Sequence, residues 1–220
     1  MPSNRYPLFA REGWPAIFVL LALIVLAQFI AGPVVFIFLL IIFLIALYFF
    51  RDPIRIIPSQ PLAVVSPVYG IVTLIEEAEE IRLHSRAIRI QITTRIQDIY
   101  SLRSPIEGKI VEQWCSKPDA NESRRHFDFY IKSDEGDNVV TAIRLRDIIR
   151  HFHVYMHSGE RLGQGQRCGY LYFGGVTDVF VPLESKVQVE VGQYVQSGST
   201  VLAQLIHSEV KSVIQENETS

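Results

Sequence analysis

The longest pattern in the chain is an apolar run near its N-terminus. No charged residue occurs from Trp14 to Phe50, and the pair Gly32-Pro33 divides this run into two apolar halves. About 20 apolar residues are enough for a helix to cross a bilayer, so each half is close to the minimum for one span. The pattern therefore predicts a transmembrane hairpin of two helices over residues 14–50, with its turn at 32–33. One long kinked helix, one tilted span or a re-entrant pair would show the same apolar run.

The charges beside the apolar run indicate its orientation. Arg5 and Arg11 precede it, and Arg51 and Arg55 follow it. A hairpin places both flanks on one side of the membrane, and the positive-inside tendency makes that side the cytoplasm. We therefore expect an inner-membrane protein with its folded domain on the cytoplasmic side. Its predicted parts are a cytoplasmic N-terminus at 1–13, the hairpin, a cytoplasmic domain at 51–206 and a polar tail at 207–220.

Beyond the hairpin the pattern becomes that of β-strands. Residues Ala87–Ile92 alternate with period two, which is typical of a half-buried strand. The layout Ser-Pro-x-x-Gly-x-Val at 66–72 returns at 104–110 with isoleucine in the last place, and Gly192–Gly198 reads Gly-x-x-Val-x-x-Gly. Short strands with glycine turns at this spacing predict a mainly β, barrel-sandwich-like domain. Further strands are expected at Phe127–Lys132 and Val139–Leu145.

Composition excludes one class of partner. The formal net charge is −2 and the isoelectric point is near 6.3, so a nucleic-acid partner has no electrostatic support. Cys115 and Cys168 stand alone in unlike contexts and form neither a metal-ligand pair nor a disulfide framework. This usage suits a reducing compartment.

One histidine pattern could bind a metal. His151, His153 and His157 share one face if their segment is a strand, and histidines two residues apart on a strand can chelate zinc. The alternative is a half-exposed polar strand face. The sequence fixes no acidic partner to orient the imidazoles, so we expect no metal site here.

Five blocks of the sequence, taken together, resemble a known family. The first reads Phe-Phe-Arg-Asp-Pro directly after the apolar run and has a further proline five residues on. In this order the blocks resemble the phosphatidylserine decarboxylases of the short, membrane-anchored kind, which implies the fold of that family for the β domain. The blocks are Phe49–Pro58, Ser66–Val72, Asp98–Pro105, Asn121–Arg124 and Gly159–Pro182.

The resemblance implies a chemistry whose three groups are replaced in this chain. In the family a serine after Phe-Gly cleaves its own chain and becomes a pyruvoyl group, while a histidine and an aspartate serve self-cleavage and proton transfer. Gly175 stands at the serine, Tyr100 at the histidine and Tyr69 at the aspartate. Glycine has no hydroxyl, and tyrosine is a poor base at neutral pH. Thr177 lies two residues on and out of the turn that fixes the scissile bond, so we expect it to be a strand hydroxyl. The prediction is therefore no catalytic residue and no pyruvoyl cofactor.

Basic residues suggest where a phospholipid could bind. Arg51 and Arg55 would lie at headgroup level, where they bind lipid phosphate or only fix the topology. Arg150 and Arg167 match positions that the family keeps basic, and they complete the set of phosphate candidates. Solvated arginines are the alternative.

Three functions follow from these observations. The first is a non-catalytic pseudoenzyme, linked to phospholipid metabolism, that binds an anionic membrane phospholipid or a lipid-synthesis protein partner. The second is an active phosphatidylserine decarboxylase, converting phosphatidylserine to phosphatidylethanolamine, with displaced chemistry. The third is a structural membrane protein whose β domain only mediates protein contacts.

Overall fold

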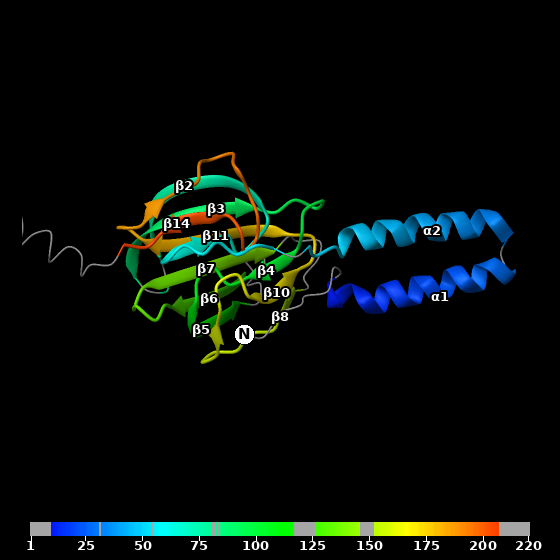
Figure 1. The fold of residues 1–220 in the computed structure, drawn as a ribbon, viewed down its shortest axis with the longest axis horizontal. Helices are drawn as coiled ribbons and strands as arrows, with labels where there is room; N and C mark the ends of the chain where they lie inside the picture. The colour runs from blue at the N-terminus through cyan, green and yellow to red at the C-terminus, as the bar shows by residue number, and fades with distance from the viewer. Residues whose placement is uncertain are drawn as a thin grey trace, which may run out of the picture.

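Two apolar helices extend from one end of a β domain in the computed structural model (Figure 1). Its described residues are 10–30, 32–53, 55–80, 82, 84–116, 126–145 and 152–206. A short 3₁₀ helix, η1 (Arg11–Gly13), precedes α1 (Trp14–Ile30), and α2 (Gly32–Phe49) follows. The prediction of a mainly β domain after two apolar N-terminal helices is confirmed.

The two helices lie side by side and return the chain to its starting point (Figure 1). The Ala10 N–H donates to the Phe50 carbonyl at 2.8 Å, so the two ends of the helical pair meet. Both helices are long and apolar enough to cross a membrane, and no residue of α2 is buried. An apolar surface of this extent indicates association with a membrane.

The β domain is built on an eight-stranded sheet that curls into a half-barrel (Figure 1). All neighbouring strands in it are antiparallel. Its strands, in spatial order, are β13 (Tyr194–Val195), β2 (Gly70–Glu80), β3 (Ser85–Thr93), β11 (Gly175–Pro182), β7 (Asn138–Leu145), β6 (His126–Lys132), β5 (Gly108–Ser116) and β9 (Arg161–Leu162). The segments predicted as strands lie within β3, β6 and β7.

Two small antiparallel sheets complete the domain. One has the order β1 (Ala63–Val65), β14 (Val201–Gln204) and β12 (Lys186–Val187). The other has the order β4 (Ser101–Arg103), β10 (Arg167–Leu171) and β8 (Phe152–Val154). Their apolar residues and the inward positions of the large sheet, such as Ile90, Phe129 and Val179, form one buried core.

The spatial order of the strands reveals an internal two-fold pseudosymmetry. The large sheet reads β13-β2-β3-β11 from one edge and β9-β5-β6-β7 from the other. Val179 and Thr141 face each other at the centre, and both hairpins carry a register shift at the same place, near Val72 and near Ile110. The repeated Ser-Pro-x-x-Gly layout is therefore the sequence trace of two similar halves.

The repeated layout forms the same turn in both halves. Ser66 Oγ donates to the Val68 carbonyl at 2.6 Å, and Ser104 Oγ donates to the Ile106 carbonyl at 2.7 Å. Gly198 N–H donates to Ser66 O at 2.7 Å and Gly165 N–H to Ser104 O at 2.9 Å. Gly165 and Gly198 both have positive φ, which glycine adopts without strain. These turns bury the residue before each Ser-Pro pair, Val65 in one half and Arg103 in the other.

Candidate functional site at the base of the helical pair

Thr94 holds together Tyr69 and Gly175, two of the residues that we predict at the chemical positions of the family that the sequence resembles. Thr94 follows β3, and its hydroxyl donates to the Tyr69 carbonyl at 2.7 Å. The Thr94 N–H donates to the carbonyl of Gly175, the first residue of β11, at 2.9 Å. The end of β3 thereby fixes the turn before β2 against the start of β11.

Steric crowding explains why glycines occupy the turn into β11. Phe173 and Gly174 have φ values of 59° and 72°, a backbone region that suits glycine and strains phenylalanine. A Cβ added at Gly174 would lie 2.7 Å from the Thr94 carbonyl oxygen. A Cβ at Gly175 would lie only 2.4 Å from the Arg144 carbonyl oxygen of the neighbouring strand. A side chain at residue 175 therefore requires the backbone to move.

Tyr100, at the third family position, belongs to an aromatic cluster at the base of α2. Its hydroxyl donates to the Ile96 carbonyl, and its ring stacks on Phe49 with centroids 6.4 Å apart. Phe173 lies 5.8 Å from the Tyr100 ring and Tyr170 lies 5.9 Å from it. All three family positions therefore lie where the helical pair meets the β domain, with aromatic side chains filling the space around Tyr100.

The aromatic cluster keeps its tyrosines neutral. Burial, and then the nearby charge of Glu12, raise the pKa of Tyr170. The same two causes raise the pKa of Tyr172. The Tyr170 hydroxyl donates to the Phe49 carbonyl at 3.3 Å, so one phenol also ties β10 to the end of α2. Both phenols are therefore protonated at neutral pH, and that of Tyr170 is a hydrogen-bond donor.

A buried network of charges also joins the helical pair to the β domain. Asp52, just after α2, lies 3.4 Å from Arg103 Nη2 and 3.5 Å from Arg167 Nε. Arg167 Nη2 contacts Glu12, just before α1, at 2.8 Å. Arg103 also donates to the Gly165 carbonyl at 3.1 Å. Sequence reasoning missed this network, because Glu12 and Arg167 are 155 positions apart and no local pattern links them.

The four arginines predicted to bind phosphate differ in their surroundings. Arg51 and Arg55 follow α2 and contact no carboxylate among the described residues. Arg167 is buried in the network with Glu12 and Asp52, so binding a phosphate there would require the loss of these partners. Arg150 lies outside the described residues. The geometry therefore favours Arg51 and Arg55 over Arg167.

The structure describes two of the three histidines, and both are exposed. His153 is exposed on β8, with its ring 5.8 Å from that of Tyr172. His157 lies beyond that strand and is exposed, with Nδ1 3.8 Å from Glu160. His151 lies outside the described residues. Within the described part of the chain, no group of three or more histidine, cysteine or acidic side chains could hold a metal ion.

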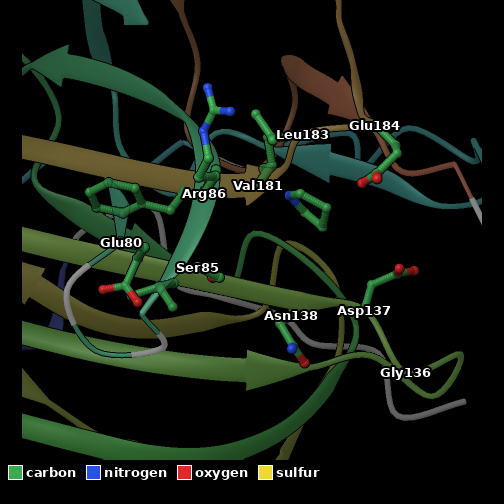
Figure 2. Close-up of a pocket in the computed structure, with 13 residues that line it drawn as sticks. Glu80, Ser85, Arg86, Gly136, Asp137, Asn138, Val181, Leu183 and Glu184 are labelled. Atoms are coloured by element: carbon green, nitrogen blue, oxygen red, sulfur yellow. The ribbon is translucent and has the colours of Figure 1, made fainter. Parts of the chain in front are cut away.

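Two cavities are lined largely by residues of the large sheet. Figure 2 shows a cavity of about 300 Å³ between Glu80, Ser85 and Arg86 on one side and the turn at Gly136–Asn138 on the other. A second cavity of about 370 Å³ shares Glu80 and Phe180 with it. The first cavity lies at the end of β11 opposite Gly175, so it takes no part in the candidate site.

Comparison with known proteins assigns the family. The chain matches the phosphatidylserine decarboxylase family over residues 42–203. It is 33% identical to a phosphatidylserine decarboxylase proenzyme of Nitrosomonas europaea over 92% of this chain and 98% of the relative. It is 34% identical to the proenzymes of Nitrosomonas eutropha, over 90% of this chain and 96% of the relative, and of Paraburkholderia xenovorans, over 91% and 98%. The chain belongs to the phosphatidylserine decarboxylase family. No solved structure matches it.

These comparisons correct the interpretation of the chain as a non-catalytic protein. The relatives match it almost from end to end, and each carries the name of a decarboxylase proenzyme. The expectation of a pseudoenzyme that only binds lipid or a partner is contradicted by this finding. The similarity favours the second of the three functions, an active decarboxylase.

The pyruvoyl group of the family does not fit residue 175 of this chain. Glycine has no hydroxyl from which such a group could form, and the Arg144 carbonyl occupies the space of a Cβ. Tyr69 and Tyr100 remain the residues that we predict at the positions of the aspartate and the histidine. Decarboxylase chemistry in this protein therefore cannot start at residue 175.

Proposed function

We propose that this protein is a phosphatidylserine decarboxylase, a carboxy-lyase that removes the serine carboxylate of phosphatidylserine as CO₂ and leaves phosphatidylethanolamine. The observation that carries the proposal is the similarity to proenzymes of this name over about nine-tenths of both chains. The fold supports it, because the family positions meet at one place beside the membrane-associated helices.

The proposal includes the placement of the protein in the inner membrane. The two helices form a transmembrane hairpin, and the β domain lies on the cytoplasmic side. Arg11 before α1 and Arg51 and Arg55 after α2 support this orientation, since basic flanks remain in the cytoplasm. The candidate site then lies at headgroup level, where a phospholipid substrate presents its serine.

The proposal also places the chemistry away from residue 175. The hydroxyl of β11 belongs to Thr177, which is fully buried and has no hydrogen-bond partner among the described residues. The masses of any cleavage fragments would identify the bond that is cut, without an assumption about its position.

The test combines intact mass with a direct assay of the full-length protein in detergent micelles. Phosphatidylserine labelled with ¹³C at the serine carboxylate is the substrate, and labelled CO₂ is the readout. We expect release of labelled CO₂ by the purified protein. A folded protein that stays a single chain of 25.1 kDa and releases no CO₂ would overturn the proposal.

Two variants of one residue test where the chemistry lies. Gly175→Ser adds a Cβ and a hydroxyl, and Gly175→Ala adds the same Cβ without the hydroxyl. We expect neither variant to exceed the wild-type rate, because both press on the Arg144 carbonyl. If the serine variant splits into two chains and exceeds both the alanine variant and the wild type, the chemistry belongs at residue 175 after all.

A further inference from the structure

The described arginines fall into two groups by their partners. Seven of them, spread over the β domain, contact carboxylates: Arg82, Arg86, Arg89, Arg103, Arg144, Arg161 and Arg167. Within the described part of the chain, the guanidinium groups of Arg11, Arg51, Arg55 and Arg95 contact no carboxylate, although the backbone N–H of Arg95 donates to Asp98 Oδ2 at 2.7 Å. Three of these four, Arg51, Arg55 and Arg95, lie around the base of α2. We call these three the basal arginines.

The first basal arginine is fixed beside an open cavity. The Arg51 guanidinium lies 3.9 Å from the centroid of the Tyr48 ring, and its Nη2 donates to the Gln97 carbonyl at 3.2 Å. A cavity of about 450 Å³ is lined by Phe49, Arg95, Ile96 and Gln97. Arg51 and Arg95 therefore approach the same turn, at the end of the apolar helix.

The other two basal arginines, Arg55 and Arg95, lie at the two ends of a row of two tyrosine rings. Arg55 lies 5.7 Å from the centroid of Tyr69, Tyr69 lies 6.1 Å from Tyr194, and Arg95 lies 5.3 Å from Tyr194. Rings that face a guanidinium orient it without neutralising its charge. Arg55 donates one hydrogen bond, to Gln196 at 3.0 Å, and this partner is also uncharged.

Electrostatics distinguishes this end of the domain from the other. Burial, and then the neighbouring Arg103, lower the pKa of Arg55, so an anion nearby would be stabilising. The pseudosymmetric turn at 133–137 carries only acidic charges, whereas the turn at 94–98 carries one arginine and one aspartate. Ser133 occupies the place of Thr94 there, donating its N–H to the Asp137 carbonyl at 2.8 Å, and the next residue is Asp134 where this end has Arg95. Because β3 and β6 run in opposite directions, the two turns lie at opposite ends of the strands of the sheet.

We propose that Arg51, Arg55 and Arg95 form a basic surface that binds the phosphate groups of membrane phospholipids where the helical pair meets the β domain. Guanidinium groups suit phosphate because they offer paired N–H donors. A lipid is favoured over free phosphate, because the exposed Ile96 and the end of α2 adjoin the same cavity and offer apolar contact to acyl chains. The inference rests on the proposed function only in taking a phospholipid as the ligand.

Lipid binding can be measured without turnover. The full-length protein in uncharged detergent is titrated with dioctanoyl phosphatidylserine, dioctanoyl phosphatidylglycerol and dioctanoylglycerol, and bound lipid is counted by native mass spectrometry. Replacing Arg51, Arg55 and Arg95 by glutamine is expected to weaken binding of both phospholipids by about tenfold or more. Arg86→Gln is the matched control, since Arg86 is exposed, paired with Glu77 and lies on the other end of β3.

The outcomes separate this proposal from the proposed function. Equal phospholipid binding by the triple variant and the Arg86→Gln control overturns the inference, whatever the decarboxylase assay shows. The inference is also overturned if dioctanoylglycerol binds as tightly as the two phospholipids and if replacing the arginines changes the binding of none of the three lipids. Full competition by inorganic phosphate at the same concentration would show a free-phosphate site and overturn the assignment to a lipid. Near-ultraviolet circular dichroism of the variant confirms that any loss is not a loss of fold.

Discussion

The two halves of the β domain build the same turn with opposite kinds of side chain. In one half, the residue before Ser-Pro is Val65, which pairs with Val201 of β14. In the other half, the equivalent residue is Arg103, which pairs with Arg167 of β10. The valine pair lies at the edge of the apolar core, whereas the arginine pair contacts Asp52 at the end of the helical pair.

This difference explains why the helical pair makes its buried ionic contacts with the arginine pair and not with the valine pair. Two buried guanidiniums require opposite charge nearby, because a desolvated charge without a partner is strongly destabilising. Asp52 and Glu12 supply that charge, one from each end of the helical pair. The valine pair needs no such partner. The buried ionic contacts to the helical pair are therefore made by the arginine pair.

The largest effect is expected from neutralising the centre of this network. Asp52→Asn keeps the shape of the side chain but leaves Glu12 as the carboxylate that contacts this arginine pair in the described part of the chain. Breaking a buried ion pair on one side typically costs about 3–5 kcal/mol, and we expect a loss of that size in the free energy of unfolding. Guanidinium-induced unfolding in detergent micelles measures it. A loss below about 1 kcal/mol would mean that water or other groups compensate the arginines.

An intermediate loss in the free energy of unfolding is expected from truncating Val65, in the half with valines. Val65 is fully buried, and Val65→Ala removes two methyl groups from a packed site. At about 0.8 kcal/mol per buried methylene plus a cavity term, the expected loss is about 2 kcal/mol. The same unfolding experiment applies. A loss larger than that of Asp52→Asn would reverse the ranking of the two halves.

The smallest effect is expected from a salt bridge at the surface of the half with arginines. Arg161 contacts Glu107 at 3.3 Å and also Asp134, and its side chain is 59% exposed. Exposed ion pairs contribute about 0–1 kcal/mol, so Arg161→Gln should change the free energy of unfolding by less than 1 kcal/mol. A larger loss would show that burial is not what separates this pair from the network around Asp52. Salt titration up to 1 M is the second readout, since exposed pairs are screened.

The sequence predicts the elements well because their patterns are local. The uncharged run and its Gly32-Pro33 interruption indicate the helices, and period-two alternation indicates β3. The polar turn at 134–138 indicates β6 and β7 on either side of it. The repeated Ser-Pro-x-x-Gly layout even contains the pseudosymmetry, although only the strand order shows that the halves are related by a two-fold axis.

The candidate site could be predicted only in part. Tyr69, Tyr100 and Gly175 are found by their places in motifs, and the structure does gather them. Arg167 was expected to meet phosphate, yet its partners are Glu12 and Asp52, which approach it from distant parts of the chain. The conclusion that the chain lacks activity was wrong in the light of its relatives, which match it almost from end to end and carry the name of decarboxylase proenzymes.

The hydrogen bond between Ala10 and Phe50 bears on how the helical pair can be exchanged for another membrane anchor. The two ends of the helical pair meet at one point, so the pair adjoins the β domain through a single junction. Gly13 is required at this junction because a Cβ there would lie 2.3 Å from the Phe50 ring. A segment with coincident ends can be lengthened, shortened or exchanged without rerouting the rest of the fold. Evolution or an engineer can thus alter the anchor and the β domain independently, provided that Glu12 and Asp52 remain at the junction.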